Sequence, residues 1–191
     1  MDLVNSCIIG NTEEAMKLIM NNNINFSIVD YNMRRTALIW TCRNAMEVVA
    51  LELIKTGKSN PYHIANDGKT ALIWACRNAM EVVALELIKT GQSNPYHIAN
   101  DGYTALIFAC QYKITKVILE LIKTGKSNPD HIDNDDNTAL SWACENDMKE
   151  VAYELVSIGV FTINDLLFLK PEWVPEEFLI MHPVDVTEVN I

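Results

Sequence analysis

Short apolar stripes recur along the chain at the spacing of amphipathic helices. Residues 71–78 and 80–90 each place apolar side chains three to four positions apart, which puts them on one helix face. Thr70 precedes the first stretch as a capping residue, and Gly91 follows the second, where a left-handed backbone ends a helix. Residues 93–102 are rich in turn formers and suit an extended finger with a tight turn. The apolar positions are Leu72, Ala75 and Cys76 in the first helix and Val83, Leu87 and Ile88 in the second.

This pattern of two helices and a finger repeats with a step of 34 residues. Thr-Ala-Leu begins at Thr36, Thr70, Thr104 and Thr138. The same step relates Cys42, Cys76, Cys110 and Cys144, and also Gly57, Gly91, Gly125 and Gly159. A helix pair this short cannot bury its apolar side alone, whereas stacked copies share one continuous core. The periodicity therefore predicts an all-α helical solenoid.

The repeated residues resemble a known family. Asn-Asp-Gly-x-Thr-Ala-Leu, followed by two helices that end in Gly, resembles the ankyrin repeat over about residues 24–159. The likeness implies about five helix-pair units joined by short β-hairpin-like fingers, with Leu3–Ile9 and Asn11–Asn22 as the helices of a degenerate first unit. The units look most like the ankyrin arrays of giant amoeba-infecting DNA viruses, which implies a viral protein that contacts the host.

The units depart from the family pattern in three respects. They have 34 residues instead of 33, and Ala replaces Pro in the Thr-Pro-Leu-His opening. The His is lost as well, and with it the hydrogen bond that ties the motif in the family, which is expected to affect stability more than fold. The replacing residues are Ile39, Ile73, Ile107 and Ser141.

The repeats divide the chain into two parts. Residues 1–159 form the array, with units near 1–23, 36–57, 70–91, 104–125 and 138–159 and fingers between them. Residues 160–191 break the pattern, with a capped helix expected at Phe161–Leu169. Because a solenoid needs its last apolar face covered, the segment is interpreted as a cap. The alternative is a docking segment that makes the protein a substrate adaptor for a ubiquitin ligase.

Charge narrows the class of partner. The formal net charge is −10, but residues 1–125 sum to +1 and residues 126–191 to −11. Phosphate backbones bind clustered Lys and Arg, so the acidic third argues against a nucleic-acid partner. No apolar run is long enough to span a membrane, and no basic flank of a signal peptide precedes one. We expect an intracellular, cytoplasmic protein.

Candidate chemistry adds little to this picture. Gly68-Lys69-Thr70 resembles the end of a phosphate-binding loop, but His63 stands where the loop needs Gly. Residues 133–144 lack the Gly and Glu of a calcium loop. One Cys per unit on a buried stripe cannot share a zinc ion with its neighbours, which implies reduced core thiols. With no catalytic motif present, we expect no enzyme activity, no cofactor and no small-molecule substrate.

The remaining hypothesis is a scaffold that binds a protein partner. The ankyrin resemblance implies recognition by fingertips and first-helix ends on a concave face. These are the places where the units differ most: Arg35, Lys69, Tyr103 and Asn137 at the fingertips, and Arg43, Arg77, Gln111, Tyr112 and Glu145 at the helix ends. Tyr and Arg often anchor interfaces, so the expected centre is Tyr103 with Tyr112. The aromatic row Trp40, Trp74, Phe108 and Trp142 is interpreted as core more than contact.

Overall fold

The computed structural model describes residues 2–21, 24–158 and 173, and within these residues it contains ten helices. The predicted cap or docking segment, with its expected helix at Phe161–Leu169, lies outside the described residues except for Trp173, whose side chain is buried. The helices are α1 Leu3–Ile8, α2 Thr12–Met20, α3 Ala37–Arg43, α4 Glu47–Lys55, α5 Ala71–Arg77, α6 Glu81–Lys89, α7 Ala105–Gln111, α8 Thr115–Lys123, α9 Ala139–Glu145 and α10 Lys149–Ser157.

Capping side chains and left-handed residues set the helix bounds. Thr70 is confirmed as the N-terminal capping residue of α5, because its hydroxyl accepts the Ile73 backbone N–H at 3.3 Å. The threonines that precede α3, α7 and α9 cap those helices in the same way. In the first turn of α9, Ser141 replaces the His of the family pattern and its hydroxyl accepts the Thr138 N–H, which completes a capping box. Gly91 ends the second helix with a φ of 66°, as expected.

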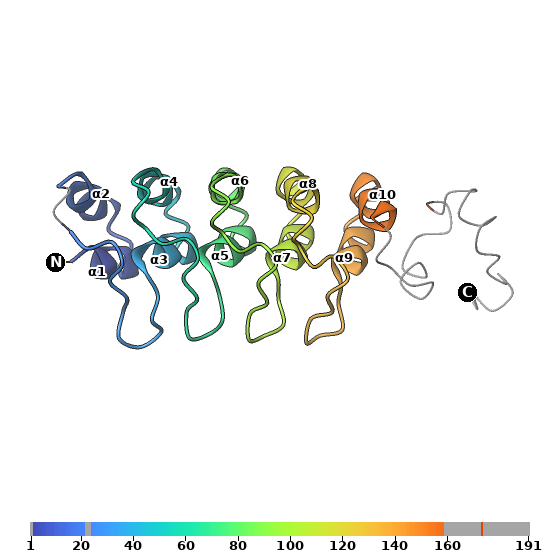
Figure 1. Ribbon diagram of the computed structural model, residues 1–191, viewed down its shortest axis with the longest axis horizontal. Coiled ribbons are helices and arrows are strands. Elements are labelled where there is room, and N and C mark those ends of the chain that lie inside the picture. Colours follow the sequence, from blue (N-terminus) through green and yellow to red (C-terminus); the bar gives the residue numbers. More distant parts are fainter. Residues whose placement is uncertain (1, 22–23, 159–172, 174–191) are drawn as a thin grey trace, which may run out of the picture.

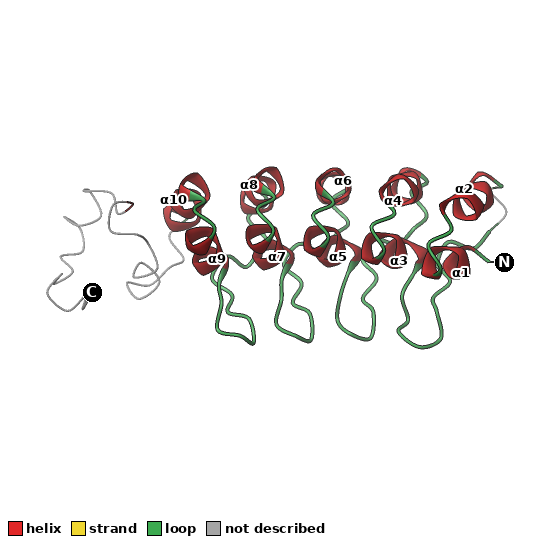
Figure 2. Ribbon diagram, turned by 180° about the vertical axis from the view of Figure 1, so that it is seen from behind, coloured by secondary structure: helices red, strands yellow, loops and turns green. Residues whose placement is uncertain are grey.

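The helices form two parallel rows. The first helices α1, α3, α5, α7 and α9 pack side by side in one row, and the second helices α2, α4, α6, α8 and α10 form the other (Figure 1). Each unit is a helix hairpin, and the loops between units extend to one side as fingers, which are best seen from behind in Figure 2. The predicted all-α helical solenoid is confirmed. The β-hairpin character of the fingers is limited to isolated bridges, such as Ile98 with Thr104.

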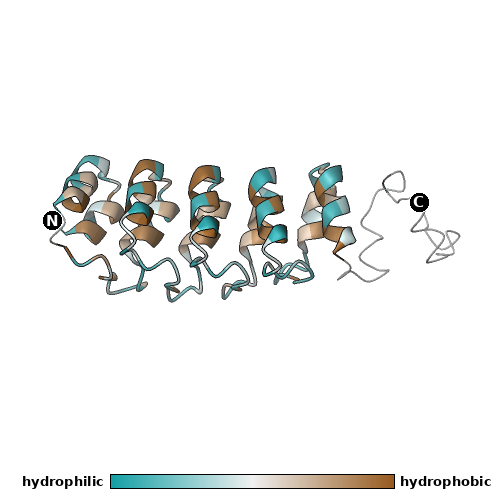
Figure 3. Cartoon of the chain, turned by 45° about the horizontal axis from the view of Figure 1, so that its top comes forward, coloured by the Kyte–Doolittle hydropathy of each residue, from teal (hydrophilic) through white to brown (hydrophobic). Residues whose placement is uncertain are grey.

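The core runs continuously between the two rows. Apolar residues lie mainly on the helices and polar residues mainly on the fingers (Figure 3). Leu72 and Leu106 are fully buried between neighbouring units, and all five cysteines are buried as the stripe predicted. Burial raises the pKa of Cys42 to about 12, so its thiol stays protonated and packs as a small apolar side chain.

Backbone contacts join each finger to the next. The Asn100 side chain donates to the Asn66 carbonyl at 2.9 Å, and its backbone N–H donates to the Asp67 carbonyl at 3.2 Å. The His97 ring bonds to the Gly68 carbonyl at 2.7 Å, and His63 and His131 contact the preceding finger in the same way. A side chain at Gly68 would meet the Asn100 backbone nitrogen at 2.6 Å. The fingers therefore form a continuous bonded edge of the array.

Candidate partner-binding face

The residue before each helix-capping threonine contacts the following finger. In three of the four units this fingertip side chain reaches an Asp that lies 32 residues further along the chain. The pairs are Arg35 with Asp67 (2.6 Å), Lys69 with Asp101, and Tyr103 with Asp135 (3.1 Å). These bonds couple adjacent fingers. The fingertip position, which varies between units, therefore has a structural role.

Burial of the fingertip residues limits what a partner could reach. Arg35 is 6% exposed and Lys69 is 5% exposed. Tyr103 is half-buried, and its ring stacks on Phe108 with the ring centroids 4.4 Å apart. Asn137 is half-buried too, and its amide donates to a carbonyl of its own finger. A partner-binding role for these four residues stays a prediction. The structure shows that all four pack or bond within the array.

The aromatic row lies directly beneath these side chains. Trp74 and Phe108 are buried, which agrees with the interpretation as core, whereas Trp40 and Trp142 are only half-buried. The Trp40 indole donates to Asp30 at 3.0 Å, but the Trp74 indole N–H is buried and has no hydrogen-bond partner. Trp74 is thus held by packing and by the cations around it.

Four predicted site residues meet around the Trp74 ring. The guanidinium carbons of Arg77, Arg35 and Arg43 lie 4.9, 5.5 and 5.5 Å from the ring centroid, and the Lys69 ammonium lies 5.8 Å from it. Arg35 and Arg43 also lie over Trp40, at 4.9 and 5.0 Å. The negative face of an indole attracts cations at this range. We name Arg35, Arg43, Lys69 and Arg77 with Trp40 and Trp74 the cation–indole cluster.

The predicted residues at the ends of the first helices are more accessible. Arg43, Arg77, Tyr112 and Glu145 are exposed, and Gln111 is half-buried. Arg43 and Arg77 close α3 and α5, while Glu145 closes α9. The charge of this face therefore changes from basic at α3 and α5 to acidic at α9, as the sequence suggested. The structure brings Arg43 and Arg77 together at one indole, and it places Glu145 two units away.

Tyr112 interrupts a ladder of asparagines. Asn78 donates from its side chain to the Cys42 and Arg43 carbonyls at 2.8 and 2.9 Å, which joins α5 to α3. Asn44 and Asn146 join their units to the preceding ones in the same way. Tyr112 has no amide to donate and instead presents a ring that is 46% exposed. The junction between α5 and α7 therefore lacks the asparagine hydrogen bonds of the other junctions and presents an accessible aromatic side chain instead.

Two pKa shifts describe the polar groups beside the aromatic row. Partial burial of Asp30 opposes its ionisation, but the backbone N–H groups of Met33, Arg35 and Asn32 and the Trp40 indole donate to it and lower its pKa overall. Burial, together with the bond to Asp135 and the nearby carboxylates, raises the pKa of Tyr103 to about 12. Asp30 therefore stays an acceptor and Tyr103 stays a donor at neutral pH.

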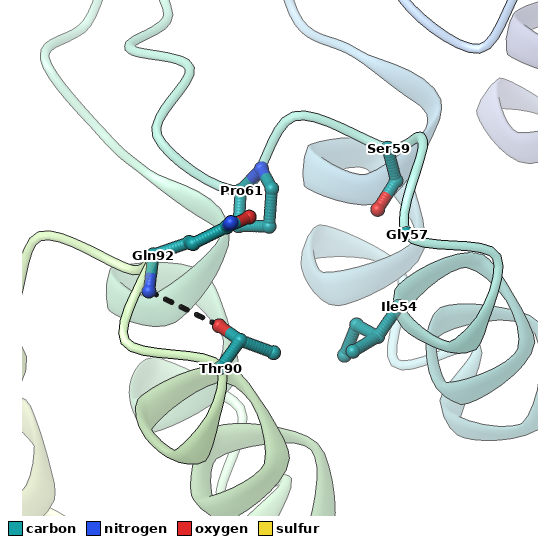
Figure 4. A pocket seen from close by; sticks show the side chains of 6 residues that line it. All are labelled: Ile54, Gly57, Ser59, Pro61, Thr90 and Gln92. Carbon is teal, nitrogen blue, oxygen red and sulfur yellow. Dashed lines mark hydrogen bonds between the residues drawn. The ribbon is translucent and has the colours of Figure 1, made fainter.

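A cavity among the described residues lies away from this face. A cleft of about 220 Å³ opens between the second and third units near the ends of α4 and α6 (Figure 4). Its lining contains no ionisable side chain and shares no residue with the predicted site: Ile54, Gly57, Ser59, Pro61, Thr90 and Gln92. Such a lining offers no acid, base or charged ligand for catalysis.

Residues 2–21, 24–158 and 173 contain neither a cluster of metal ligands nor a membrane-spanning helix. In these ranges no three His, Cys, Asp or Glu side chains are placed to hold a metal ion. None of the helices in the same ranges has the length and apolar character needed to cross a bilayer. Neither finding adds a candidate site to the finger and first-helix face.

Sequence reasoning missed the partners of the fingertip residues. Asp67, Asp101 and Asp135 recur at the 34-residue step, two positions before the fingertip residues Lys69, Tyr103 and Asn137. That recurrence was the available signal, because acidic residues in register with basic ones indicate pairing between neighbouring repeats. The cation–indole cluster was harder to find, since its members come from two fingers and two helix ends.

Comparison with protein families identifies the repeats. A family model described as ankyrin repeats, in three copies, matches residues 3–96 and 83–165. No curated protein sequence matches the chain. The family match spans all five helix pairs.

Proposed function

The chain belongs to the ankyrin repeat family, and from this premise we propose that it is a protein-interaction scaffold whose fingers and first-helix ends bind a protein partner. Ankyrin repeats generally mediate protein–protein interaction, and the family is typically non-enzymatic. The observation that carries the proposal for this chain is the exposure of Tyr112, Arg43 and Arg77 on one row of helix ends.

Several features support the row of first-helix ends as the binding face over the row of second helices. An aromatic ring and two guanidiniums supply much contact area with few mobile bonds, which is typical of binding anchors. They stand on helices that are bonded to their neighbours through Asn44, Asn78 and Asn146, so the face is rigid. A rigid face loses little conformational entropy when a partner binds.

The sequence resemblance guides where a partner is sought. The units look like the arrays of giant amoeba-infecting viruses, so amoebal host lysate is the first source, and a cytoplasmic host protein is the expected partner. The adaptor alternative rests on residues 160–191, of which the structure describes Trp173 alone. It stays a prediction from the sequence.

Tyr103 makes a poor test residue, although it was the expected centre of the face. Its ring stacks on Phe108 and its hydroxyl bonds to Asp135, so truncating it would weaken the array as well as any interface. Gln111 and Tyr112 are better targets, because they lie at the end of α7 and the Tyr112 ring is 46% exposed.

We expect Gln111→Ala/Tyr112→Ala to lose a partner that the unchanged protein captures from lysate. The matched control, Val82→Ala/Leu119→Ala, truncates two exposed apolar side chains on α6 and α8 in the other row. Both variants should melt within a few degrees of the unchanged protein, since surface truncations shift stability by about 0.5 kcal/mol. Capture that survives the first variant and fails with the second would place recognition on the second helices.

A further inference from the structure

We infer that Arg43 and Arg77 form a preformed receptor for the carboxylates of an acidic peptide segment. The inference deepens the proposed function and rests on it, because it names the chemistry of the partner on the same face. It starts from the four cations that surround Trp74, which differ in how their charge is balanced.

Two of the four cations are already neutralised. Arg35 and Lys69 are buried, and their charged groups pair with Asp67 and Asp101 of the following fingers. Buried charges require such partners, because leaving water without one costs several kcal/mol. These two side chains therefore act in holding the fingers together and have no charge left for a ligand.

The charges of Arg43 and Arg77 are balanced in a different way. Both are exposed, and within the described parts of the chain neither forms an ion pair. Each guanidinium instead lies over two aromatic rings: Arg43 over Trp40 and Trp74, and Arg77 over Trp74 and Phe108 at 4.9 and 5.8 Å. The aromatic surface restrains the side chains and leaves their hydrogen-bond donors without an acidic acceptor.

This restraint suits carboxylate recognition. A guanidinium presents a rigid fork of donors that matches the two oxygens of a carboxylate. Stacking on the rings limits the rotamers of Arg43 and Arg77 before any ligand arrives, so less side-chain entropy is lost on binding. Since both side chains lie against Trp74, a single short peptide can place acidic residues on both.

The charge distribution favours a short acidic peptide over a long polyanion. Residues 126–158 hold two Lys and eight Asp or Glu, which sum to −6, and Glu145 ends α9 in the same helix row. A nucleic acid laid along the first-helix row would meet these acidic residues, whereas a short segment need contact only the basic units at α3 and α5.

The test measures binding of a fluorescein-labelled Gly/Ser peptide of about twelve residues that carries several Glu. Its matched peptide has Gln in place of each Glu. The variant Arg43→Gln/Arg77→Gln removes the receptor, and Arg34→Gln/Lys126→Gln removes the same charge from two exposed residues outside the cluster. Equal melting temperatures show that each variant folds as the unchanged protein does.

We expect the Glu peptide to bind more tightly than the Gln peptide, and to weaken about tenfold or more in Arg43→Gln/Arg77→Gln. The control variant should bind within about twofold of the unchanged protein, and affinity should fall between about 50 and 200 mM salt. Equal binding of the two peptides, equal loss in both variants, or tighter binding of a single-stranded oligothymidylate would overturn the inference.

The two proposals fail in distinguishable ways. If only the peptide inference is wrong, Gln111→Ala/Tyr112→Ala still abolishes partner capture while Arg43→Gln/Arg77→Gln captures the partner normally. If the proposed function is wrong, capture survives both of these variants.

Discussion

Replacement of Trp74 by Ala is expected to lower the free energy of unfolding by about 3–5 kcal/mol. Trp74 lies on α5 at the middle of the array, 8% exposed, where it packs in the core beneath the cation–indole cluster. Truncation leaves a cavity and removes the shared ring on which Arg43 and Arg77 rest. Denaturant unfolding followed by circular dichroism measures the loss. A midpoint unchanged from the parent would show that the ring is not part of the core.

Trp74→Phe is the matched control for this prediction. The equivalent position of the next unit is Phe108, which packs there with 5% exposure. Phe also removes the indole N–H, which is buried without a hydrogen-bond partner in Trp74. The loss of ring area is thereby partly offset, since an unsatisfied buried donor costs about 1–3 kcal/mol. We expect Trp74→Phe to cost less than half of what Trp74→Ala costs.

Asp67→Ala is expected to destabilise the array by about 2–4 kcal/mol. Asp67 accepts from the Arg35 guanidinium at 2.6 Å, and the Arg35 side chain is 7% exposed between Trp40 and Trp74. Removing the carboxylate leaves a buried cation without its counter-charge. Because the Asp67 side chain is itself partly exposed, some water can reach the pair and the cost stays below that of a fully buried ion pair.

The equivalent change in the fourth finger provides the control. Asp135 accepts from the neutral Tyr103 hydroxyl, so Asp135→Ala strands no charge. It should cost about 0.5–1.5 kcal/mol, the value of an ordinary hydrogen bond. Adding Arg35→Met to Asp67→Ala should recover part of the stability. Equal losses for Asp67→Ala and Asp135→Ala would contradict the argument from the buried charge.

The fold could be predicted almost entirely because it repeats. The helices from α3 onward are marked by the same signals: Thr before the first helix of a unit, an apolar stripe, and Gly91 or its equivalents after the second. Local capping and burial decide these elements, and four near-copies confirm one another. The observed bounds differ from the expected ones by one or two residues, as for α6 at Glu81–Lys89 against an expected 80–90.

The candidate face could be predicted only in outline. Variation between units singled out two rows of positions, but it could not separate their buried members from their exposed ones. Arg35 and Arg43 look alike in the sequence, yet one is buried in an ion pair and the other lies exposed on indole rings. That difference depends on where Asp67 of the following finger lies, which is a contact across 32 residues that no local pattern encodes.

The central claim is that recognition occurs on the fingers and the ends of the first helices. Hydrogen–deuterium exchange of the protein with and without its captured partner tests it most directly. We expect added protection from exchange when the partner is bound at residues 42–46, 76–80 and 110–114, where α3, α5 and α7 end, and in the fingers that precede these helices. Protection confined to the second helices, with these residues unchanged, would contradict it.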